Sequence, residues 1–217
     1  MQDGENSMRL ATVVLLLTLC DVLPAWGADY SVLLLTPTAE DARLGSVDKA
    51  IRFWNEMLSD LGLDLRLAAP EVIIESPSAR VVENYARDLA MRSRRPPARG
   101  TEPPPPDAVA RLDADIILLL SRQDILSFTW TMPKVTPRRH LVVIRMVGGA
   151  DRDDDIVQRH VVAHEIGHAL GLPHNNESHA LMCGPCVPLP DTFDADAFLP
   201  LTNDDRALLL ELHDSSR

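Results

Sequence analysis

Apolar residues along this chain gather into short runs that end at proline or glycine, and these runs predict strands. Residues 30–37 (YSVLLLTP), 114–121 (ADIILLLS) and 140–147 (HLVVIRMV) are mostly apolar, which is typical of strands buried on both faces. Residues 63–68 (LDLRLA) alternate between apolar and polar positions. Residues 128–133 (FTWTMP) are partly polar and stop at proline, as an edge strand does. We therefore expect a sheet of five strands.

Four other segments repeat their apolar positions at helical spacing. In the first, Ser46 is the expected N-cap and Gly62 the expected stop. Residues 78–92 predict a second helix. The acidic run 151–155 precedes a third, where negative charge suits the positive end of the helix dipole. Residues 202–214 (TNDDRALLLELHD) predict a capped amphipathic helix near the C-terminus.

A segment rich in proline and arginine interrupts this order. Residues 92–107 (RSRRPPARGTEPPPPD) contain six prolines and four arginines, which disfavour both helix and sheet. Strands continue beyond it, so we interpret it as a solvated loop inserted in one domain; a proline motif that binds a partner is the alternative. At 217 residues, we expect a single domain over residues 28–217.

The apolar run at the N-terminus predicts an export signal. A basic residue precedes residues 10–20 (LATVVLLLTLC), and Ala25 and Gly27 supply the small side chains before a cleavage site after Gly27. The run is well short of the ~20 apolar residues that span a bilayer. We expect residues 1–27 to be a signal peptide and the protein to be secreted or periplasmic. Lipid anchoring at Cys20 is a weaker alternative.

The net charge of the chain excludes one class of partner, and its cysteines predict a disulfide. The full chain has a formal net charge of −11, which becomes −9 without residues 1–27, and no basic stripe with interleaved aromatic residues is present. A net negative protein binds polyanions poorly, so we expect no nucleic acid partner. Two cysteines follow the signal peptide, Cys183 and Cys186, and in an exported chain such a pair favours a disulfide.

Three histidines lie in the otherwise apolar sequence HEIGHALGLPH, residues 164–174. Imidazole nitrogens are costly to bury without partners, so the three indicate a shared metal ion. His164 and His168 are four residues apart on a helix, project from one face and can reach the same ion. Gly171 can adopt the left-handed turn that brings His174 back as the third ligand.

Three neutral histidines leave one coordination position open, which is typical of a catalytic zinc. We therefore expect one Zn²⁺, with Glu165 better placed to reach a water than the metal. For His160, one turn earlier, we expect a supporting or buried hydrogen-bonding role. The acidic run 151–155 leaves Ca²⁺ open, without further support. We expect the remaining histidines to lie on the surface; they are His140, His179 and His213.

The chain resembles the metzincin clan of zinc endopeptidases, and within it the matrixin catalytic domain. The clan motif HExxHxxGxxH is met by His164, Glu165, His168, Gly171 and His174. Met182 lies eight residues past the third histidine, the spacing of the matrixin methionine turn. The segments DADIILLL and LTNDD also resemble matrixin sequence, and the resemblance covers residues 113–212 closely.

This resemblance implies an α+β, zincin-like fold: a mixed, mostly parallel five-stranded twisted sheet with a backing helix, an active-site helix and a C-terminal helix. It implies an endopeptidase in which Glu165 takes a proton from a zinc-activated water and passes it to the leaving amine. A protein or peptide substrate would pair with the edge strand, whose residues are Ser127, Phe128, Thr129, Trp130 and Thr131. We expect a monomer.

Departures from the family pattern leave two rival functions open. Asn175 stands where matrixins usually have serine, and the structural zinc and calcium loops of vertebrate matrixins are not recognisable. One rival is a zinc-binding recognition domain without turnover. The other is a zinc amidase that acts on cell wall or small peptides.

The tetrapeptide CGPC, residues 183–186, matches the redox motif of thioredoxins. In those proteins the first cysteine precedes a helix, whereas VPLPD follows here, and two prolines in five residues disfavour a helix start. We therefore predict a small structural disulfide, with a redox or metal-blocking thiolate as the alternative. The matrixin resemblance implies that this loop forms the wall of the primed-side substrate pocket.

Overall fold

The structure is a computed structural model, and it describes residues 28–93, 104–146, 155–189, 193–194 and 196–213. The predicted signal peptide, most of the proline-rich loop and most of the acidic run 151–155 lie outside these residues. In chain order the elements are β1 (Ala28–Tyr30), β2 (Val32–Thr36), α1 (Arg43–Asp60), β3 (Leu65–Leu67), β4 (Glu71–Ile74), α2 (Pro77–Ser93), α3 (Asp107–Ala110), β5 (Ile116–Leu120), β6 (Phe128–Thr131), β7 (His140–Ile144), α4 (Asp155–Ala169) and α5 (Asn203–His213).

The main sheet has five strands in the order β4-β2-β5-β7-β6. All neighbouring pairs are parallel except β6 and β7, which are antiparallel. The expected α+β fold with a mixed, mostly parallel five-stranded sheet is therefore confirmed. Strand β6 is at one edge, as its polar residues and Pro133 predicted, and none of the described strands pairs with its outer side.

The prediction was wrong about which segment supplies the fifth strand. The alternating segment LDLRLA forms β3, which pairs with β1 in a separate two-stranded sheet. The fifth strand of the main sheet is β4, which the sequence analysis missed. Pro70 lies between β3 and β4 and has no N–H to continue the ladder, so pairing resumes only at Glu71, opposite Leu33. The side chains of β4 are largely exposed, which hides the burial pattern of a strand.

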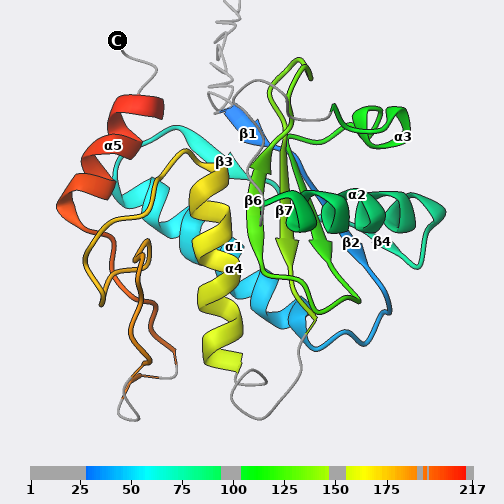
Figure 1. Cartoon of the computed structure of the whole chain (residues 1–217). Helices are drawn as coiled ribbons and strands as arrows, with labels where there is room; N and C mark the ends of the chain where they lie inside the picture. The colour runs from blue at the N-terminus through cyan, green and yellow to red at the C-terminus, as the bar shows by residue number, and fades with distance from the viewer. Residues whose placement is uncertain (1–27, 94–103, 147–154, 190–192, 195, 214–217) are drawn as a thin grey trace, which may run out of the picture.

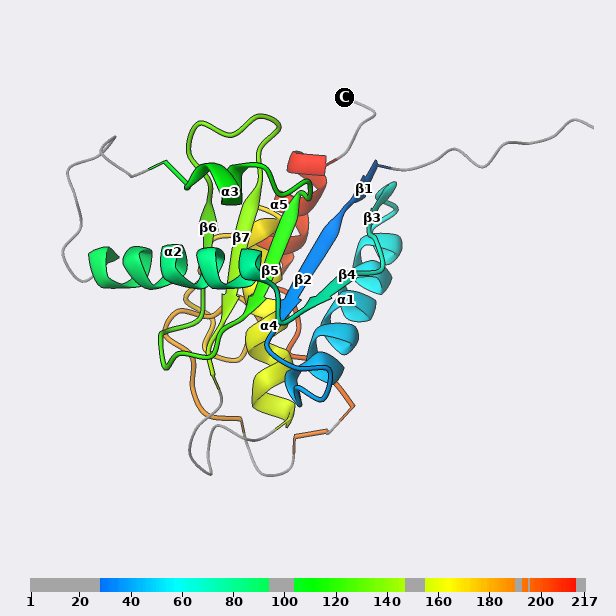
Figure 2. The same cartoon turned by 90° about the vertical axis from the view of Figure 1, so that its right-hand side faces the viewer.

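Helices cover both faces of the main sheet. Helices α1 and α4 pack against each other on one face, and Figure 2 shows α2 crossing the opposite face, close to α3. Alternate residues of each central strand point to the two sides: Leu118 belongs to the core with α1 and α4, and Leu119 to the core with α2. This alternation explains why the central strands are apolar at every position.

Helix α1 begins three residues before the predicted N-cap, and Ser46 is buried inside it. The N-cap position is Ala42, which makes no side-chain cap, and Oδ1 of the preceding Asp41 accepts a hydrogen bond from the main-chain N–H of Arg43 at 3.0 Å. The buried Arg43 guanidinium pairs with Asp41 and donates to the carbonyls of Ser121 and Arg145, both at 2.8 Å. Burial opposes ionisation of Asp41, but the hydrogen bonds from Arg43 hold its pKa below the ordinary value.

Other helix boundaries follow the sequence closely. Gly62 ends α1 with a φ of 73°, as predicted for a glycine stop. Helix α2 covers the predicted segment 78–92 with one extra residue at each end. Thr202 caps α5, because its hydroxyl accepts the main-chain N–H of Asp205 at 3.1 Å. Within the described part of the chain, none of the helices is both long and apolar enough to cross a bilayer.

Candidate metal centre and active site

Three histidines converge beside the C-terminal half of α4, which lies in front of α1 and to the left of the sheet in Figure 1. His164 and His168 project from one face of the helix, as predicted. Gly171 then turns the chain with a φ of 99° and brings back His174. The Nε2 atom of His174 lies 3.1 Å from Nε2 of His164 and 3.1 Å from Nε2 of His168. Ligands about 2.0 Å from a tetrahedral ion lie about 3.3 Å apart, so the spacing fits one zinc ion.

Backbone carbonyls fix the tautomers of two of these histidines. Nδ1 of His164 lies 2.7 Å from the carbonyl oxygen of Leu181, and Nδ1 of His168 lies 2.7 Å from that of Leu172. A carbonyl only accepts, so each Nδ1 carries the proton and each Nε2 presents a lone pair. One N–H on Nε2 of His174 could satisfy only one of the two lone pairs. A cation satisfies all three nitrogens together, and the residues present therefore fit zinc.

Burial favours the neutral form of the His164 and His168 imidazoles. Desolvation lowers the pKa of His164 to about 4, opposed by the hydrogen bond to Leu181 and reinforced by the neighbouring histidines. Desolvation also lowers the pKa of His168. Neutral imidazole is the form that binds a metal, so both side chains are ready to coordinate at neutral pH.

Glu165 adjoins the first histidine and is buried, with 7 % of its surface exposed. Its Oε2 accepts a hydrogen bond from Oγ1 of Thr129 at 2.9 Å, and the same hydroxyl lies 2.6 Å from the main-chain oxygen of Glu165. Burial raises the pKa of Glu165 to about 7, and the Thr129 hydrogen bond opposes this shift. A carboxyl group with a pKa near neutrality can both take and return a proton. Both residues were candidates from the sequence, but their spacing gave no sign of this contact.

The edge strand β6 contacts α4 through one face and the hydrophobic core under α2 through the other. Phe128 and Trp130 pack against the core on the α2 side, whereas Thr129 points to α4. Oγ1 of Thr131 lies 3.3 Å from Nδ1 of His140. Ser127, just before the strand, accepts the main-chain N–H of Arg145 at 3.1 Å. The predicted substrate-binding segment therefore borders the histidine centre through Thr129.

Met182, the residue expected in a methionine turn, packs against α4. A Cβ added to Gly167 of α4 would stand 2.5 Å from Sδ of Met182, so the methionine packs directly on the helix backbone. Trp54 of α1 supports the same turn, because its Nε1 donates to the carbonyl of Ala163 at 2.8 Å. Both Met182 and Trp54 are fully buried. The residue at 167 must therefore be small.

The loop after Met182 returns to the third histidine. Cys183 and Cys186 form a disulfide, as predicted. The main-chain N–H of Asn175 donates to Met182 at 2.7 Å, and that of Gly184 donates back to Asn175 at 2.8 Å. The side chain of Asn175 donates to Oδ2 of Asp205, which is buried, at 2.8 Å. Asn175 thus ties the segment after His174 to α5, a link that the sequence analysis missed.

His160 has no free nitrogen for the metal. Its Nδ1 lies 2.6 Å from the carbonyl oxygen of Ile156, and its Nε2 accepts the main-chain N–H of Leu199 at 3.0 Å. The buried hydrogen-bonding role is therefore the correct one of the two expected. Beside it, the buried Arg159 donates to the carbonyl of Ala197 at 2.6 Å and lies over the ring of Phe198. Together they hold the segment before α5 against α4.

Two of the three histidines expected on the surface are not exposed. His140 is buried in β7, and desolvation lowers its pKa, with a smaller contribution from Arg138 and an opposing one from Asp115. His213 is half-buried, with Nε2 2.8 Å from the carbonyl oxygen of Leu170. His179 is exposed, as predicted. In both corrections the burial of the histidine depends on tertiary packing, in β7 for His140 and against the end of α4 for His213.

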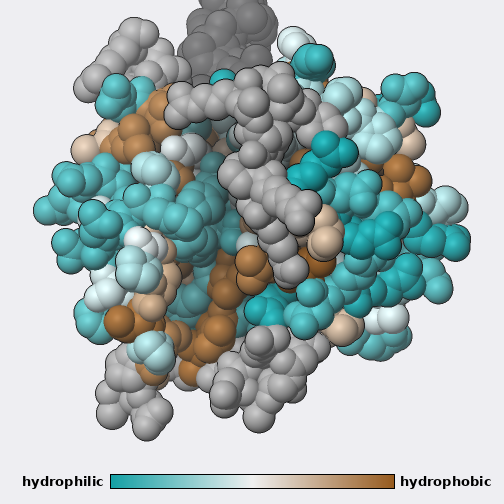
Figure 3. Space-filling view, viewed as in Figure 1, coloured by the Kyte–Doolittle hydropathy of each residue, from teal (hydrophilic) through white to brown (hydrophobic). Residues whose placement is uncertain are grey.

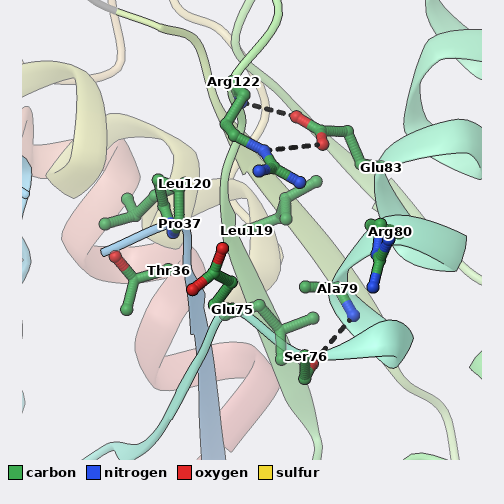
Figure 4. Close-up of a pocket in the computed structure, with 11 residues that line it drawn as sticks. Thr36, Pro37, Glu75, Ser76, Ala79, Arg80, Glu83, Leu119, Leu120 and Arg122 are labelled. Carbon is green, nitrogen blue, oxygen red and sulfur yellow. Dashed lines mark hydrogen bonds and ion pairs between the residues drawn. The ribbon is translucent and has the colours of Figure 1, made fainter. Parts of the chain in front are cut away.

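A small pocket of about 110 Å³ lies elsewhere, at the C-terminal ends of β2 and β5 next to the start of α2 (Figure 4). Its polar rim includes Glu75, Arg80 and the Arg122–Glu83 pair. It contains none of the predicted site residues. The histidine centre instead reaches the surface, because His174 is exposed and His164 and His168 are partly exposed. Figure 3 shows a strip of hydrophobic surface over the lower half of α4, between hydrophilic flanks. An extended peptide suits an open face better than a closed pocket does.

One family model and several solved structures are similar to this chain. The family model Peptidase_M10, described as Matrixin, matches residues 101–214. No curated protein matches. Among solved structures, archaemetzincin from Methanopyrus kandleri is 16 % identical with a TM-score of 0.45, and the match covers 88 % of this chain and 98 % of that one. Metalloproteinase-II from Bacteroides fragilis is 16 % identical with a TM-score of 0.46, over 88 % of this chain and 54 % of that one.

The matched segment begins ahead of β5 and extends through the histidine centre to the end of α5. It covers more than half of the chain and includes each of the histidines, the glutamate and the methionine described above. The chain therefore belongs to the matrixin family of zinc-dependent peptidases.

Proposed function

We propose that the chain is an exported zinc endopeptidase that binds one Zn²⁺ through Nε2 of His164, His168 and His174. The observation that carries this proposal is the convergence of three imidazole nitrogens, two of them held as lone-pair donors by backbone carbonyls, beside a buried carboxyl group. When bound, zinc acidifies a water molecule and polarises the scissile carbonyl.

Glu165 is the proposed general base and acid. Its carboxyl group adjoins the first ligand without being one, and burial raises its pKa to about 7. At Oε1 or Oε2 it takes the proton of the attacking water and later delivers it to the nitrogen of the leaving amine. A pKa near the working pH favours both transfers.

The proposed substrate is an extended segment of a protein or peptide that pairs with β6. The outer side of β6 has no partner among the described strands, so its main-chain N–H and C=O groups can accept an added strand. This strand passes next to Glu165 at Thr129, which would bring the scissile bond close to the base. Binding through main-chain groups in mid-chain supports cleavage at internal bonds.

Export is proposed on two grounds. Residues 10–20 and the small residues before position 28 have the pattern of a secretion signal. The Cys183–Cys186 disulfide is the form expected in an oxidising compartment. Analysis of the N-terminus of the protein recovered from a secreting host tests the first ground, and a start at Ala28 is expected.

Peptidase assays separate this proposal from its rivals. The zinc-loaded protein is incubated with an unfolded protein and a mixed peptide library, and the products are mapped by mass spectrometry. Internal cleavage that a chelator abolishes and added Zn²⁺ restores is the expected result. Binding of peptides without any cleavage would support the recognition domain, and hydrolysis of cell-wall amides alone would support the amidase.

A further inference from the structure

We infer that Thr129 is a positioning residue for Glu165: its hydroxyl holds Oε2 of the carboxyl group and leaves Oε1 to face the reacting groups. This inference rests on the proposed role of Glu165 as the base. It assigns to the edge strand a task beyond pairing with the substrate.

The contact joins two elements that are far apart in the sequence but adjacent in the fold. Thr129 lies in β6 and Glu165 in α4, 36 residues apart in sequence, and these elements pack against each other. Oγ1 of Thr129 lies 2.9 Å from Oε2 and 2.6 Å from the main-chain oxygen of Glu165. No other described residue forms a side-chain hydrogen bond with Glu165, so Thr129 alone fixes its carboxyl group from the protein side.

A hydroxyl suits this position better than another donor would. It carries one proton that can turn toward either acceptor, and it can itself accept a hydrogen bond. When Glu165 is ionised, Thr129 donates to Oε2, because a charged acceptor binds the proton more strongly. When Glu165 has taken a proton at Oε1, Oε2 remains an acceptor, so the Thr129 hydroxyl can still donate to it. The carboxyl group is therefore held before and after it moves a proton.

The β-branched side chain adds rigidity. Threonine has few χ1 rotamers in a strand, and its backbone is fixed by pairing opposite Val142 of β7. Glutamate has three side-chain torsions, so without this contact its carboxyl group would sample several positions. A displacement of about 1 Å at a reacting group can lower the rate roughly 10²-fold.

Two substitutions at position 129 test the inference with the zinc-loaded enzyme. Thr129→Val keeps the shape and removes the hydroxyl, whereas Thr129→Ser keeps the hydroxyl. We expect the valine variant to lose about 10–100-fold in kcat, with KM and zinc affinity changed less than about threefold, and the serine variant to recover most of the rate. Wild-type kcat in Thr129→Val, or equal loss in both variants, would overturn the inference.

A matched control separates positioning from stability. Thr36 is buried, whereas Thr129 is partly exposed, and Thr36 likewise donates its hydroxyl to a main-chain oxygen, that of Thr38 at 2.8 Å, at the C-terminal end of β2. Thr36→Val should therefore destabilise the fold while kcat stays at the wild-type value. If Thr36→Val lowers kcat as much as Thr129→Val, the effect is general and the inference is wrong.

A second readout needs neither metal nor substrate. Denaturant unfolding of the metal-free protein is measured for Thr129→Val, Glu165→Ala and the double variant. Thr129→Val should lower the denaturant midpoint of unfolding less when Glu165 is already alanine, because the contact with the carboxyl group is then absent. Equal shifts of the midpoint in both backgrounds would contradict the inferred contact. If the wild type cleaves nothing, the proposed function fails; if it cleaves and Thr129→Val is equally fast, only this inference fails.

Discussion

Gly184 lies directly against the imidazole ring of His174. A Cβ at position 184 would stand 2.8 Å from Cγ and 3.0 Å from Nδ1 of the ring, which is closer than side chains approach each other. The disulfide loop therefore packs directly against the third histidine. Only glycine, which has no Cβ, leaves room for the His174 ring at this position.

Gly184→Ala is therefore expected to weaken zinc binding, although residue 184 does not contact the metal. The added methyl group must displace the ring of His174, and residues that orient a metal ligand typically change affinity 10–100-fold. Chelator competition would measure the loss. Gly45→Ala is the matched control, since a Cβ at 45 in α1 meets nothing within 4 Å and zinc affinity should not change.

Glu165→Ala should keep the fold and the zinc, because Glu165 supplies none of the three converging nitrogen atoms. We expect kcat to fall by about 10²–10⁴-fold, the contribution of a positioned general base. Zinc content and peptidase rate should be measured on the same preparation. Loss of zinc in this variant, or full activity, would contradict the assigned role.

His174→Ala and His160→Ala should separate a ligand from a structural histidine. Removal of His174 leaves two protein ligands and should lower zinc affinity strongly. Removal of His160 leaves the carbonyl of Ile156 and the N–H of Leu199 without their bonds, so we expect a loss of about 1–3 kcal/mol in unfolding free energy and a smaller effect on zinc. Equal loss of zinc in both variants would show that the ligand set is wrong.

The parts of this molecule that the sequence predicted depend on local spacing. His164 and His168 share a face because they are four residues apart on a helix, and Gly171 needs a positive φ to return His174. The central strands were recognisable because burial on both faces leaves no polar position. Each of these features can be read from a window of a few residues.

The parts that the sequence missed depend on contacts between distant segments. Thr129 meets Glu165 across 36 residues, and Asn175 meets Asp205 across 30. The choice of β4 over β3 as the fifth strand follows from register beside β2, and the burial of His140 follows from its place next to β6. Residue type and spacing give no signal for such pairs.

The buried His140 should make stability depend on pH. Its pKa is lowered in the folded state, so below about pH 6.5 the unfolded chain binds a proton that the folded chain does not. Stability is therefore lost as the pH falls from about 6.5 toward the folded pKa. His140→Gln should flatten the dependence of the melting temperature on pH between 7.5 and 5.5, measured on the zinc-loaded protein. An unchanged slope would show that His140 does not contribute.

The disulfide should affect local order more than global stability. Cys183 is buried and Cys186 is exposed, and the bond closes a loop of only four residues, which stabilises by at most about 2 kcal/mol in the chain-entropy account. The main-chain bonds of Asn175 with Met182 and Gly184 do not involve the sulfurs, so they should hold His174 in place when the bridge is removed. The double variant Cys183→Ser, Cys186→Ser should therefore keep its zinc and most of its thermal stability. The resemblance to matrixins implies that this loop forms the wall of the primed-side pocket, and on that hypothesis cleavage-site profiling should show altered peptide preference. Unchanged preference, or two free thiols found by mass spectrometry in protein from an oxidising compartment, would contradict this role.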